Sequence, residues 1–131
     1  MELEPLEFIA PANQFRGDLP LSSAVRVGKL VFVSGIPPYD QDGAIAVGSF
    51  SAQMRQAMEN ITRILKAAGT GWDRVAKVNI LLTRRQDFAE MNRIYSTYFL
   101  NGSYPARTTA IVASLPNPDF LLEIECQAVL K

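Results

Sequence analysis

The longest regular pattern of apolar residues lies between residues 51 and 68. Apolar side chains return there every three or four residues, which is the period of an α-helix with one buried face. The stripe consists of Met54, Ala57, Met58, Ile61, Ile64, Leu65 and Ala68. Gly69 follows it, and glycine is typical of a helix C-terminus because it adopts a left-handed backbone conformation without strain. The pattern therefore predicts an amphipathic helix over residues 51–68.

A second helical pattern lies between residues 87 and 99. Its apolar and aromatic residues again recur at helical spacing, so they would share one face. The stripe consists of Phe88, Met91, Ile94, Tyr95 and Tyr98. Asp87 and Glu90 stand three residues apart at its start, which is the spacing of a capping box. We therefore predict a second amphipathic helix over residues 87–99, with its aromatic residues in the core.

Three short extended segments are predicted before the first helix. The run AVRVGKLVFVSG, residues 24–35, indicates two strands joined at Gly28-Lys29, where a hairpin would turn. The part from Leu30 to Val33 is so continuously apolar that we expect both of its faces to be covered. The run DGAIAVG, residues 42–48, is predicted as a third short strand that ends in a turn.

Three further strands are predicted at residues 74–83, 106–114 and 120–130, and the first and last of them show alternation of side chains. In the first of these, one face consists of Ala76, Val78, Ile80 and Leu82. In the last, one face consists of Phe120, Leu122, Ile124, Cys126, Ala128 and Leu130. The opposite face of the last strand therefore carries Glu123 and Glu125.

The order of these elements, β-β-β-α-β-α-β-β, predicts one α+β domain over residues 1–131. Two helices can cover only one face of the sheet, so the other face is expected to be open. Leu81, Leu121 and Val129 would lie on that open face, where contact with water is unfavourable by about 25 cal/mol per Å² of apolar surface. We therefore expect a closed homo-oligomer that buries this face.

The composition narrows the chemistry that the chain can perform. Its 13 Lys and Arg residues balance 13 Asp and Glu residues, and it contains no histidine and one cysteine. These counts exclude a Ser-His-Asp triad, a His-ligated metal and a disulfide framework, and the zero net charge disfavours a nucleic-acid partner. Cys126 is expected to be a buried small hydrophobe rather than a nucleophile. Catalysis would have to use carboxylate, Arg, Lys, Tyr or hydroxyl groups.

The sequence carries no signal for export or for membrane insertion. Its first residues, MELEPLEF, are acidic and lack a long apolar core, and no run approaches the roughly 18 apolar residues of a membrane span. We therefore expect a cytoplasmic protein with no membrane partner.

Arg107, Glu123 and Glu125 are the main candidates for binding and acid-base catalysis. A guanidinium near the start of a strand can hold a substrate carboxylate with two parallel hydrogen bonds. It can equally form an ion pair with Glu123 or Glu125, or hold such a pair until a ligand arrives. The two glutamates emerge on one side of their strand about 7 Å apart, which suits acid-base work but also suits a solvated face. Asn92 can bond a loop or a ligand.

These residues stand in motifs that resemble those of a known family. The runs are AVRVGKLVFVSG, SAQMRQAMENITRILKAAG, VAKVNILLT, DFAEMNRIYSTYF, YPARTTAIVASLP and LEIECQAVL. Over about residues 19–131 they are similar to the reactive intermediate deaminase family, also called the Rid or YjgF family, whose members were formerly described as L-PSP endoribonucleases or translation inhibitors. The combination of YPARTT, LP and EIE is the most specific part of this resemblance.

The resemblance implies a fold, an assembly and an activity. It implies a chorismate-mutase-like fold and a homotrimer whose sheets form an inner β-barrel, with a site in each cleft between neighbouring subunits. It also implies a hydrolase similar to 2-iminobutanoate/2-iminopropanoate deaminase. Such an enzyme converts reactive enamines and imines of amino acids, for example 2-aminoacrylate, to 2-keto acids and ammonia without a cofactor.

The resemblance also implies roles for particular residues. Arg107 matches the family's arginine for the substrate carboxylate, and Glu123 matches the glutamate that positions or activates water. The other matching pocket positions are Ser34, Gly35, Asn92, Tyr104 and Thr109. The loop before Glu123 is about one residue longer than usual, so the choice of Glu123 over Glu125 assumes an insertion there.

One departure from the family pattern bears on function. Leu21 stands in LPLSSA where the family commonly has the tyrosine of GPYSQA, so a hydroxyl that could bind substrate is missing. This leaves room for a larger or more apolar substrate, including a ring-cleavage enamine such as that of 2-aminomuconate deaminase. A non-catalytic sensor of small carboxylates is the alternative from the binding class. An endoribonuclease is disfavoured by the zero net charge and the lack of histidine.

Overall fold

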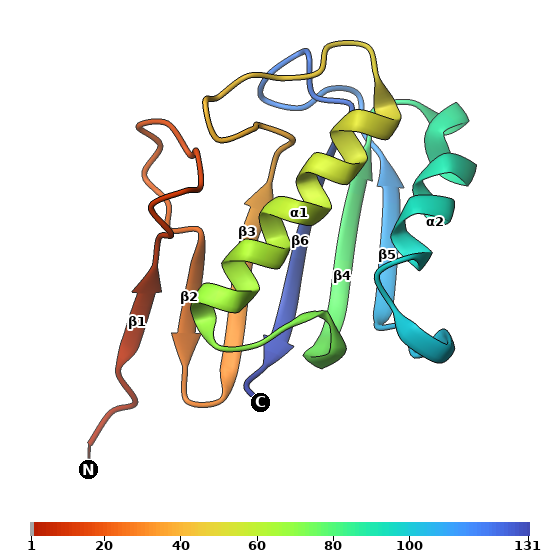
Figure 1. Cartoon of the computed structure of the whole chain (residues 1–131). Helices are drawn as coiled ribbons and strands as arrows, with labels where there is room; N and C mark the ends of the chain where they lie inside the picture. Colours follow the sequence, from red (N-terminus) through yellow and green to blue (C-terminus); the bar gives the residue numbers. More distant parts are fainter. Residues whose placement is uncertain (1) are drawn as a thin grey trace.

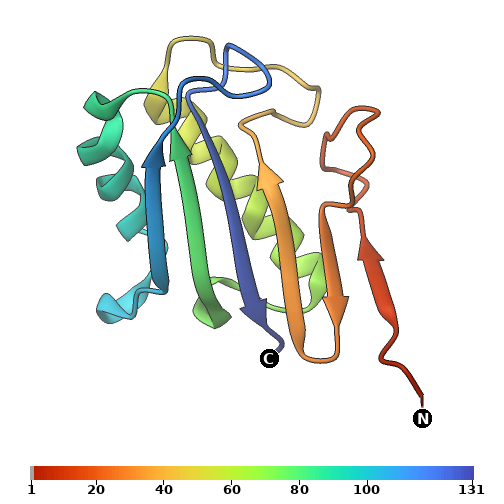
Figure 2. The same ribbon diagram turned by 180° about the vertical axis from the view of Figure 1, so that it is seen from behind.

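The computed structural model describes residues 2–131 as one six-stranded sheet with two α-helices. Figure 1 shows both helices on the same side of the sheet, and Figure 2 shows the other side bare. The elements are β1 (Leu6–Ile9), β2 (Ala24–Val27), β3 (Leu30–Ile36), α1 (Phe50–Ala68), β4 (Val75–Leu82), α2 (Phe88–Ser96), β5 (Ala106–Ile111) and β6 (Leu122–Val129), with 3₁₀ turns at Trp72–Arg74, Arg85–Asp87 and Leu100–Gly102. The predicted α+β class and one-sided helical cover are confirmed.

The strands lie in the order β1-β2-β3-β6-β4-β5. Strands β4 and β5 are parallel and every other neighbouring pair is antiparallel. Parallel neighbours need a long crossover connection, and the chain between β4 and β5 supplies it with α2. The predicted hairpin is confirmed, because Val27 pairs with Leu30 and Gly28 turns the chain with a φ of 56°.

Helix α1 confirms the first predicted helix to within one residue. The hydroxyl of Ser49 accepts a hydrogen bond from the backbone N of Ala52 at 3.4 Å, and Gly69 ends the helix with a φ of 93°. Every residue of its predicted apolar stripe is fully buried. Burial of each large side chain in such a stripe contributes roughly 1.5–3 kcal/mol, so tertiary packing rather than propensity stabilises this helix.

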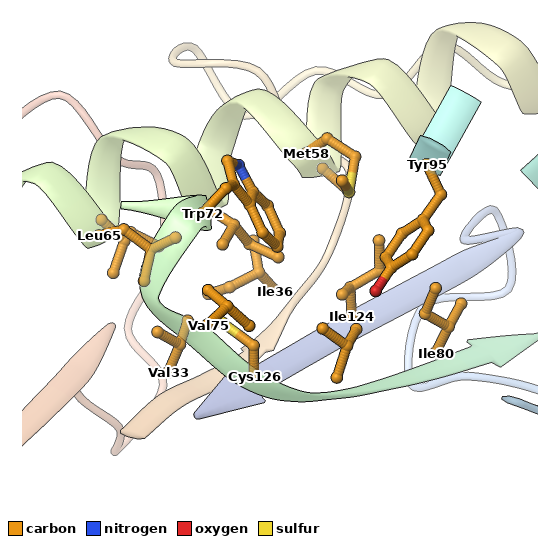
Figure 3. Close-up of a cluster of buried hydrophobic side chains, with 14 of the residues drawn as sticks. Val33, Ile36, Met58, Leu65, Trp72, Val75, Ile80, Tyr95, Ile124 and Cys126 are labelled. Carbon is orange, nitrogen blue, oxygen red and sulfur yellow. The ribbon is translucent and has the colours of Figure 1, made fainter. Parts of the chain in front are cut away.

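The core fills the space between the helices and the covered face of the sheet. Figure 3 shows Met58 of α1 and Tyr95 of α2 beside the strand residues Ile80, Ile124 and Cys126. The Cys126 side chain is 2% exposed, which confirms that it is a buried small hydrophobe. Burial also raises the pKa of its thiol to about 12, so it is not a thiolate near pH 7.

The strand predicted at residues 42–48 is wrong. These residues form turns and irregular chain, because the carboxylate of Asp40 accepts hydrogen bonds from the backbone N of Asp42 and of Ala44, each at 2.9 Å. The third strand before α1 is instead β1, whose residues the sequence pattern did not single out. It adds to the sheet by pairing with β2.

The predicted capping box at the start of the second helix is also wrong. Asp87 makes no capping bond, because both of its carboxylate oxygens accept hydrogen bonds from Arg84, at 2.7 and 3.0 Å. Helix α2 runs from Phe88 to Ser96 and is shorter than the pattern predicted. Phe88, placed on the buried stripe by its spacing, is 44% exposed.

Two positions differ from the predicted alternation. The pairing of β4 with β6 shifts between Val75 and Lys77, so Ala76 is exposed rather than on the buried face. Leu121 lies just before β6 and packs against the core, although alternation placed it on the open face. Strands β5 and β6 also end earlier than predicted.

The face of the sheet without helices carries exposed apolar side chains. Leu30 is 50% exposed and Phe32 is 40% exposed, so a single chain does not cover both faces of β3 as expected. Leu81 and Val129 lie on the same open face and are partly buried. Within residues 2–131, neither helix combines the length and the apolar character that crossing a membrane requires.

Candidate active site

Arg107 lies on the helix-covered side of the sheet, in a hollow at the edge strand β5. Its register with Val78, which is fully buried, directs its side chain under α2. The guanidinium carbon lies 5.0 Å from the centre of the Tyr95 ring, and Nη1 lies 3.9 Å from the sulfur of Met91. We call the hollow of about 420 Å³ around it the Arg107 pocket, which is also lined by Asn92, Tyr95, Ser96, Tyr104 and Pro105.

The guanidinium of Arg107 has no acidic partner in the part of the chain that the structure describes. Among residues 2–131, no carboxylate lies within ion-pair distance of it, so the alternative of an ion pair with Glu123 or Glu125 is wrong within one chain. Burial raises the pKa of Tyr95 to about 12, so the Tyr95 hydroxyl is neutral at pH 7 and supplies no counter-charge. A half-buried cation with free hydrogen-bond donors is suited to hold an anion.

Glu123 lies on the opposite side of the sheet from Arg107. It pairs with Leu81 on the open face, whereas Arg107 lines up with Val78 on the covered face. Since side chains on opposite faces of a sheet do not meet, one chain does not bring the two groups together. The structure therefore contains two separate candidate sites, which we call half-sites, one built around a cation and the other around a carboxylate.

The carboxylate of Glu123 packs directly against the backbone at Gly35. A Cβ added at Gly35 would overlap Oε1 of Glu123 and lie 3.1 Å from its Cδ, so only glycine leaves room for the carboxylate there. The pairing of β3 with β6 shifts between Val33 and Ile36, and this irregularity brings Gly35 to the carboxylate. Burial and the negative charge of Glu125 raise the pKa of Glu123.

Glu123 and Gly35 lie in a pocket of about 540 Å³, which we call the Glu123 pocket. Its remaining walls come from loops around residues 14–23, 36–39 and 116–120. Glu125 is not part of it: this residue is exposed and its Oε1 accepts a hydrogen bond from Nδ2 of Asn79 at 3.0 Å. The geometry thus separates the two glutamates, which sequence spacing alone left equivalent.

Two buried amides of α1 hold the loops around the Glu123 pocket. Gln53 donates to the carbonyls of Ala46 and Asp119 at 3.1 and 3.0 Å, and its Oε1 accepts from the backbone N of Leu121 at 2.8 Å. Asn60 donates to the carbonyl of Tyr39 at 2.7 Å. Such polar positions within an apolar stripe were not recognised from the sequence, although each interrupts the helical pattern at a fully buried position.

Not all of the other predicted site residues line the two pockets. Asn92 and Tyr104 join Arg107 in the Arg107 pocket. Thr109 lines an adjoining hollow of about 460 Å³, and its buried Oγ1 has no hydrogen-bond partner within residues 2–131. The Ser34 hydroxyl donates to the carbonyl of Ser22 at 2.6 Å, so it fastens the loop beside the Glu123 pocket rather than lining that pocket.

The described residues hold no cluster of three or more His, Cys, Asp or Glu side chains that could bind a metal ion. The polar groups of the two half-sites are a guanidinium, a carboxylate with a raised pKa and nearby amide and hydroxyl groups. Aromatic residues that the sequence did not single out as site residues complete both pockets. They are Tyr95 beside Arg107, and Phe15, Tyr39 and Phe120 beside Glu123.

The sequence matches that of known proteins over almost its full length. Residues 12–130 match the sequence model of a family described as Endoribonuclease L-PSP. A RutC family protein of Pyrococcus horikoshii is 43% identical over 110 residues, which are 83% of this chain and 86% of that protein. The protein of Mus musculus named 2-iminobutanoate/2-iminopropanoate deaminase is 40% identical over 111 residues, which are 84% of this chain and 81% of that protein.

The fold also matches solved structures. The crystal structure of E. coli TdcF with bound serine has a TM-score of 0.88 and 32% sequence identity to this chain. The match covers 95% of this chain and 99% of that one. The sheet, both helices and the loops around the two half-sites therefore fall within the shared fold.

Proposed function

The chain belongs to the endoribonuclease L-PSP family, which is the Rid or YjgF family, and from this premise we propose that it is a hydrolytic deaminase of reactive imines and enamines of amino acids. In this reaction water adds to the carbon of the C=N bond of an imino acid. The C–N bond then breaks, and the products are a 2-keto acid and ammonia. An enamine first takes up a proton on carbon to become the imine. Arg107, a half-buried cation without an acidic partner among residues 2–131, carries the proposal.

The site is shared between chains in a homotrimer. A single chain leaves Arg107 and Glu123 on opposite faces of its sheet, so a cleft that contains both needs a neighbouring copy. The open face carries exposed apolar side chains such as Leu30 and Phe32, whose burial against another copy is favourable. A closed ring of three chains would form three equivalent clefts of this kind.

Arg107 binds the carboxylate of the imino acid. Charge-assisted hydrogen bonds of this type contribute roughly 1.5–3 kcal/mol, and they fix the imine carbon relative to the rest of the cleft. The Tyr95 ring and the Met91 sulfur hold the guanidinium in place without neutralising it. Asn92 and Tyr104 offer further polar contacts at the same end of the substrate.

Glu123 positions the attacking water and accepts its proton. A carboxylate is a better base when its pKa lies nearer to the working pH, and burial raises the pKa of Glu123 in this direction. General-base assistance of this kind typically contributes about 10²–10⁴ in rate. Gly35 leaves space for the carboxylate, and Ser34 fastens the neighbouring loop.

Two relatives support this assignment. The mouse relative is named for the deamination of small imino acids, and the TdcF structure contains serine, an amino acid with the carboxylate and nitrogen that an imine substrate would present. Both relatives are more than 30% identical to this chain over most of its length.

To test the proposal, imines are generated in situ from several amino acids with an amino-acid oxidase. The rate of keto acid formation is then compared with and without the protein. We expect acceleration over buffer, and we expect Glu123→Gln to lower it by at least about 100-fold. Glu125→Gln is the matched control, because Glu125 carries the same charge two residues away but lies outside the pocket. Rates equal to buffer for every imine would refute the proposal.

A second candidate function is the binding of small carboxylates without catalysis. Leu21 favours it, because this wall of the Glu123 pocket offers an apolar side chain and no hydroxyl to a reacting group. In that case Arg107→Met would abolish the binding of a keto acid, whereas Glu123→Gln would leave binding intact and no imine would be hydrolysed faster than in buffer.

A further inference from the structure

The Glu123 pocket is lined mainly by apolar side chains. Leu19 and Leu21 form one wall, and they are 58% and 37% exposed. Phe15, Tyr39 and Phe120 form another. Ligand pockets combine a mostly apolar lining with a few polar groups that orient the ligand, and here Glu123 stands at such a lining.

The aromatic wall of this pocket is formed in advance of any ligand. The rings of Phe15 and Tyr39 meet edge to face at 4.8 Å, and those of Tyr39 and Phe120 meet at 5.1 Å. Gly43 lies so close beneath Phe15 that a Cβ there would be 2.8 Å from the ring. Phe120 is 5% exposed and anchors the wall in the core.

The lining contains one cation, Arg16, and its side chain is hydrogen-bonded to the wall that Leu21 forms. Its Nη1 donates a hydrogen bond to the backbone carbonyl of Leu21 at 2.6 Å, and the side chain is exposed. A carboxylate placed among the leucines and aromatic rings would lose its hydration, and Glu123 in the same pocket would repel it.

We infer that the Glu123 pocket takes the side chain of the imino acid, and that the preferred substrates derive from amino acids with large apolar side chains, either branched aliphatic or aromatic. Leu19 and Leu21 are the residues that set this preference. The inference rests on the proposed function, because it places the substrate carboxylate on the Arg107 of a neighbouring copy. Each methylene that moves from water into such a wall raises kcat/KM by about fourfold.

The test compares imines generated from L-alanine, L-leucine, L-phenylalanine and L-glutamate at equal rates of supply. We expect kcat/KM for the leucine and phenylalanine imines to exceed that for the alanine imine by at least about 10-fold. The glutamate imine should be no better than the alanine imine. This ranking uses the unmodified protein, so it does not depend on the folding of any variant.

A double variant then tests the assignment to individual residues. Leu19→Ser with Leu21→Ser should reduce the ratio of leucine-imine to alanine-imine kcat/KM by at least about fivefold, because two apolar contacts are lost. The matched control is Leu3→Ser with Val47→Ser. These residues are 87% and 67% exposed and lie outside the pocket, so the ratio should stay unchanged.

The possible outcomes separate this inference from the proposed function. Hydrolysis that is fastest for the alanine or the glutamate imine would overturn the inference and leave the deaminase standing. A preference for large apolar imines that survives in the double variant would overturn the role of Leu19 and Leu21. If no imine is hydrolysed, the proposed function fails and this inference fails with it.

Discussion

The Arg107 pocket and the Glu123 pocket differ in how the chain builds them. The Arg107 pocket uses regular elements, because its residues come mainly from α2 and the start of β5. The Glu123 pocket uses a strand irregularity at Gly35 and three loops, which the buried amides of Gln53 and Asn60 attach to α1. Under the proposed function, the rigid scaffold would hold the end that all imino acid substrates share, and the loops would surround the end that varies.

The two pockets also differ in the charged group at their centre. Among residues 2–131, Arg107 has no carboxylate within ion-pair distance and Glu123 has no cation within ion-pair distance. Had they lain on one face of the sheet, an ion pair would have satisfied both and left nothing for a ligand. Separation on opposite faces keeps both available, at the cost of needing a second chain.

The largest changes in activity are expected from two variants that each inactivate one half-site, and from mixing these variants. Arg107→Met should lower kcat/KM by at least about 10-fold and Glu123→Gln by at least about 100-fold. When equal amounts of the two variants are unfolded in urea and refolded together, about a quarter of the clefts in a ring combine an intact Arg107 with an intact Glu123. Activity should therefore recover to about a quarter of that of the unmodified protein.

The control for this complementation is a mixture of Arg74→Met and Glu125→Gln, which should remain fully active before and after refolding. These residues carry the same charges but line neither of the two pockets. No recovery in the first mixture, with refolding of the second intact, would show that the two half-sites do not combine across chains.

A smaller effect is expected from Gly35→Ala, which alters only the Glu123 pocket. The added Cβ occupies the space of the Glu123 carboxylate, which must rotate away, so kcat/KM should fall by about 10-fold or more. Gly35 does not have a positive φ, so the backbone accepts alanine, and the melting temperature should change little. In a Glu123→Gln background the same substitution should cost much less activity, and equal losses in both backgrounds would contradict this account.

The sequence predicted the regular parts of this comparison better than the irregular ones. The periodicity of α1 and the alternation along β6 follow from burial of one face, and the structure confirms both. The register shifts at Ala76 and beside Gly35 depend on pairing with a distant strand, β6, which no local pattern reports. The apparent strand at residues 42–48 failed because Asp40 bonds the backbone locally.

The face on which Arg107 lies was likewise beyond local patterns. The strand sequence ARTTAI has no clear alternation of apolar and polar residues, so either its odd-numbered or its even-numbered residues could have faced the core. Only the parallel register with β4 places Arg107 beside Val78 and excludes an ion pair with the glutamates of β6 within one chain. The motif resemblance implied that Arg107 binds a substrate carboxylate. The structure shows that, among residues 2–131, no carboxylate of the chain itself occupies the guanidinium.

The smallest effect on activity is expected from a change in the pKa of Glu123. Burial first, and the charge of Glu125 second, raise the pKa of Glu123. If Glu123 acts as a base, the rate falls as the pH drops through this raised pKa, because the carboxylate becomes protonated. Glu125→Gln removes one of the two causes, so the acidic limb of the kcat/KM profile should move to lower pH by a fraction of a unit.

The raised pKa of Glu123 favours its role as a base, but it should lower the free energy of unfolding at neutral pH. A carboxyl group whose pKa is raised by folding binds its proton more tightly in the folded state than in the unfolded state. It therefore destabilises the fold above the raised pKa and has no such effect below the unfolded pKa. Glu123→Gln should thus increase the melting temperature slightly at pH 7–8, and this gain should vanish near pH 3, at fixed protein concentration. An equal gain at both pH values would assign the effect to packing rather than to charge, whereas a gain confined to neutral pH would show that the carboxylate is retained for its chemistry at the expense of stability.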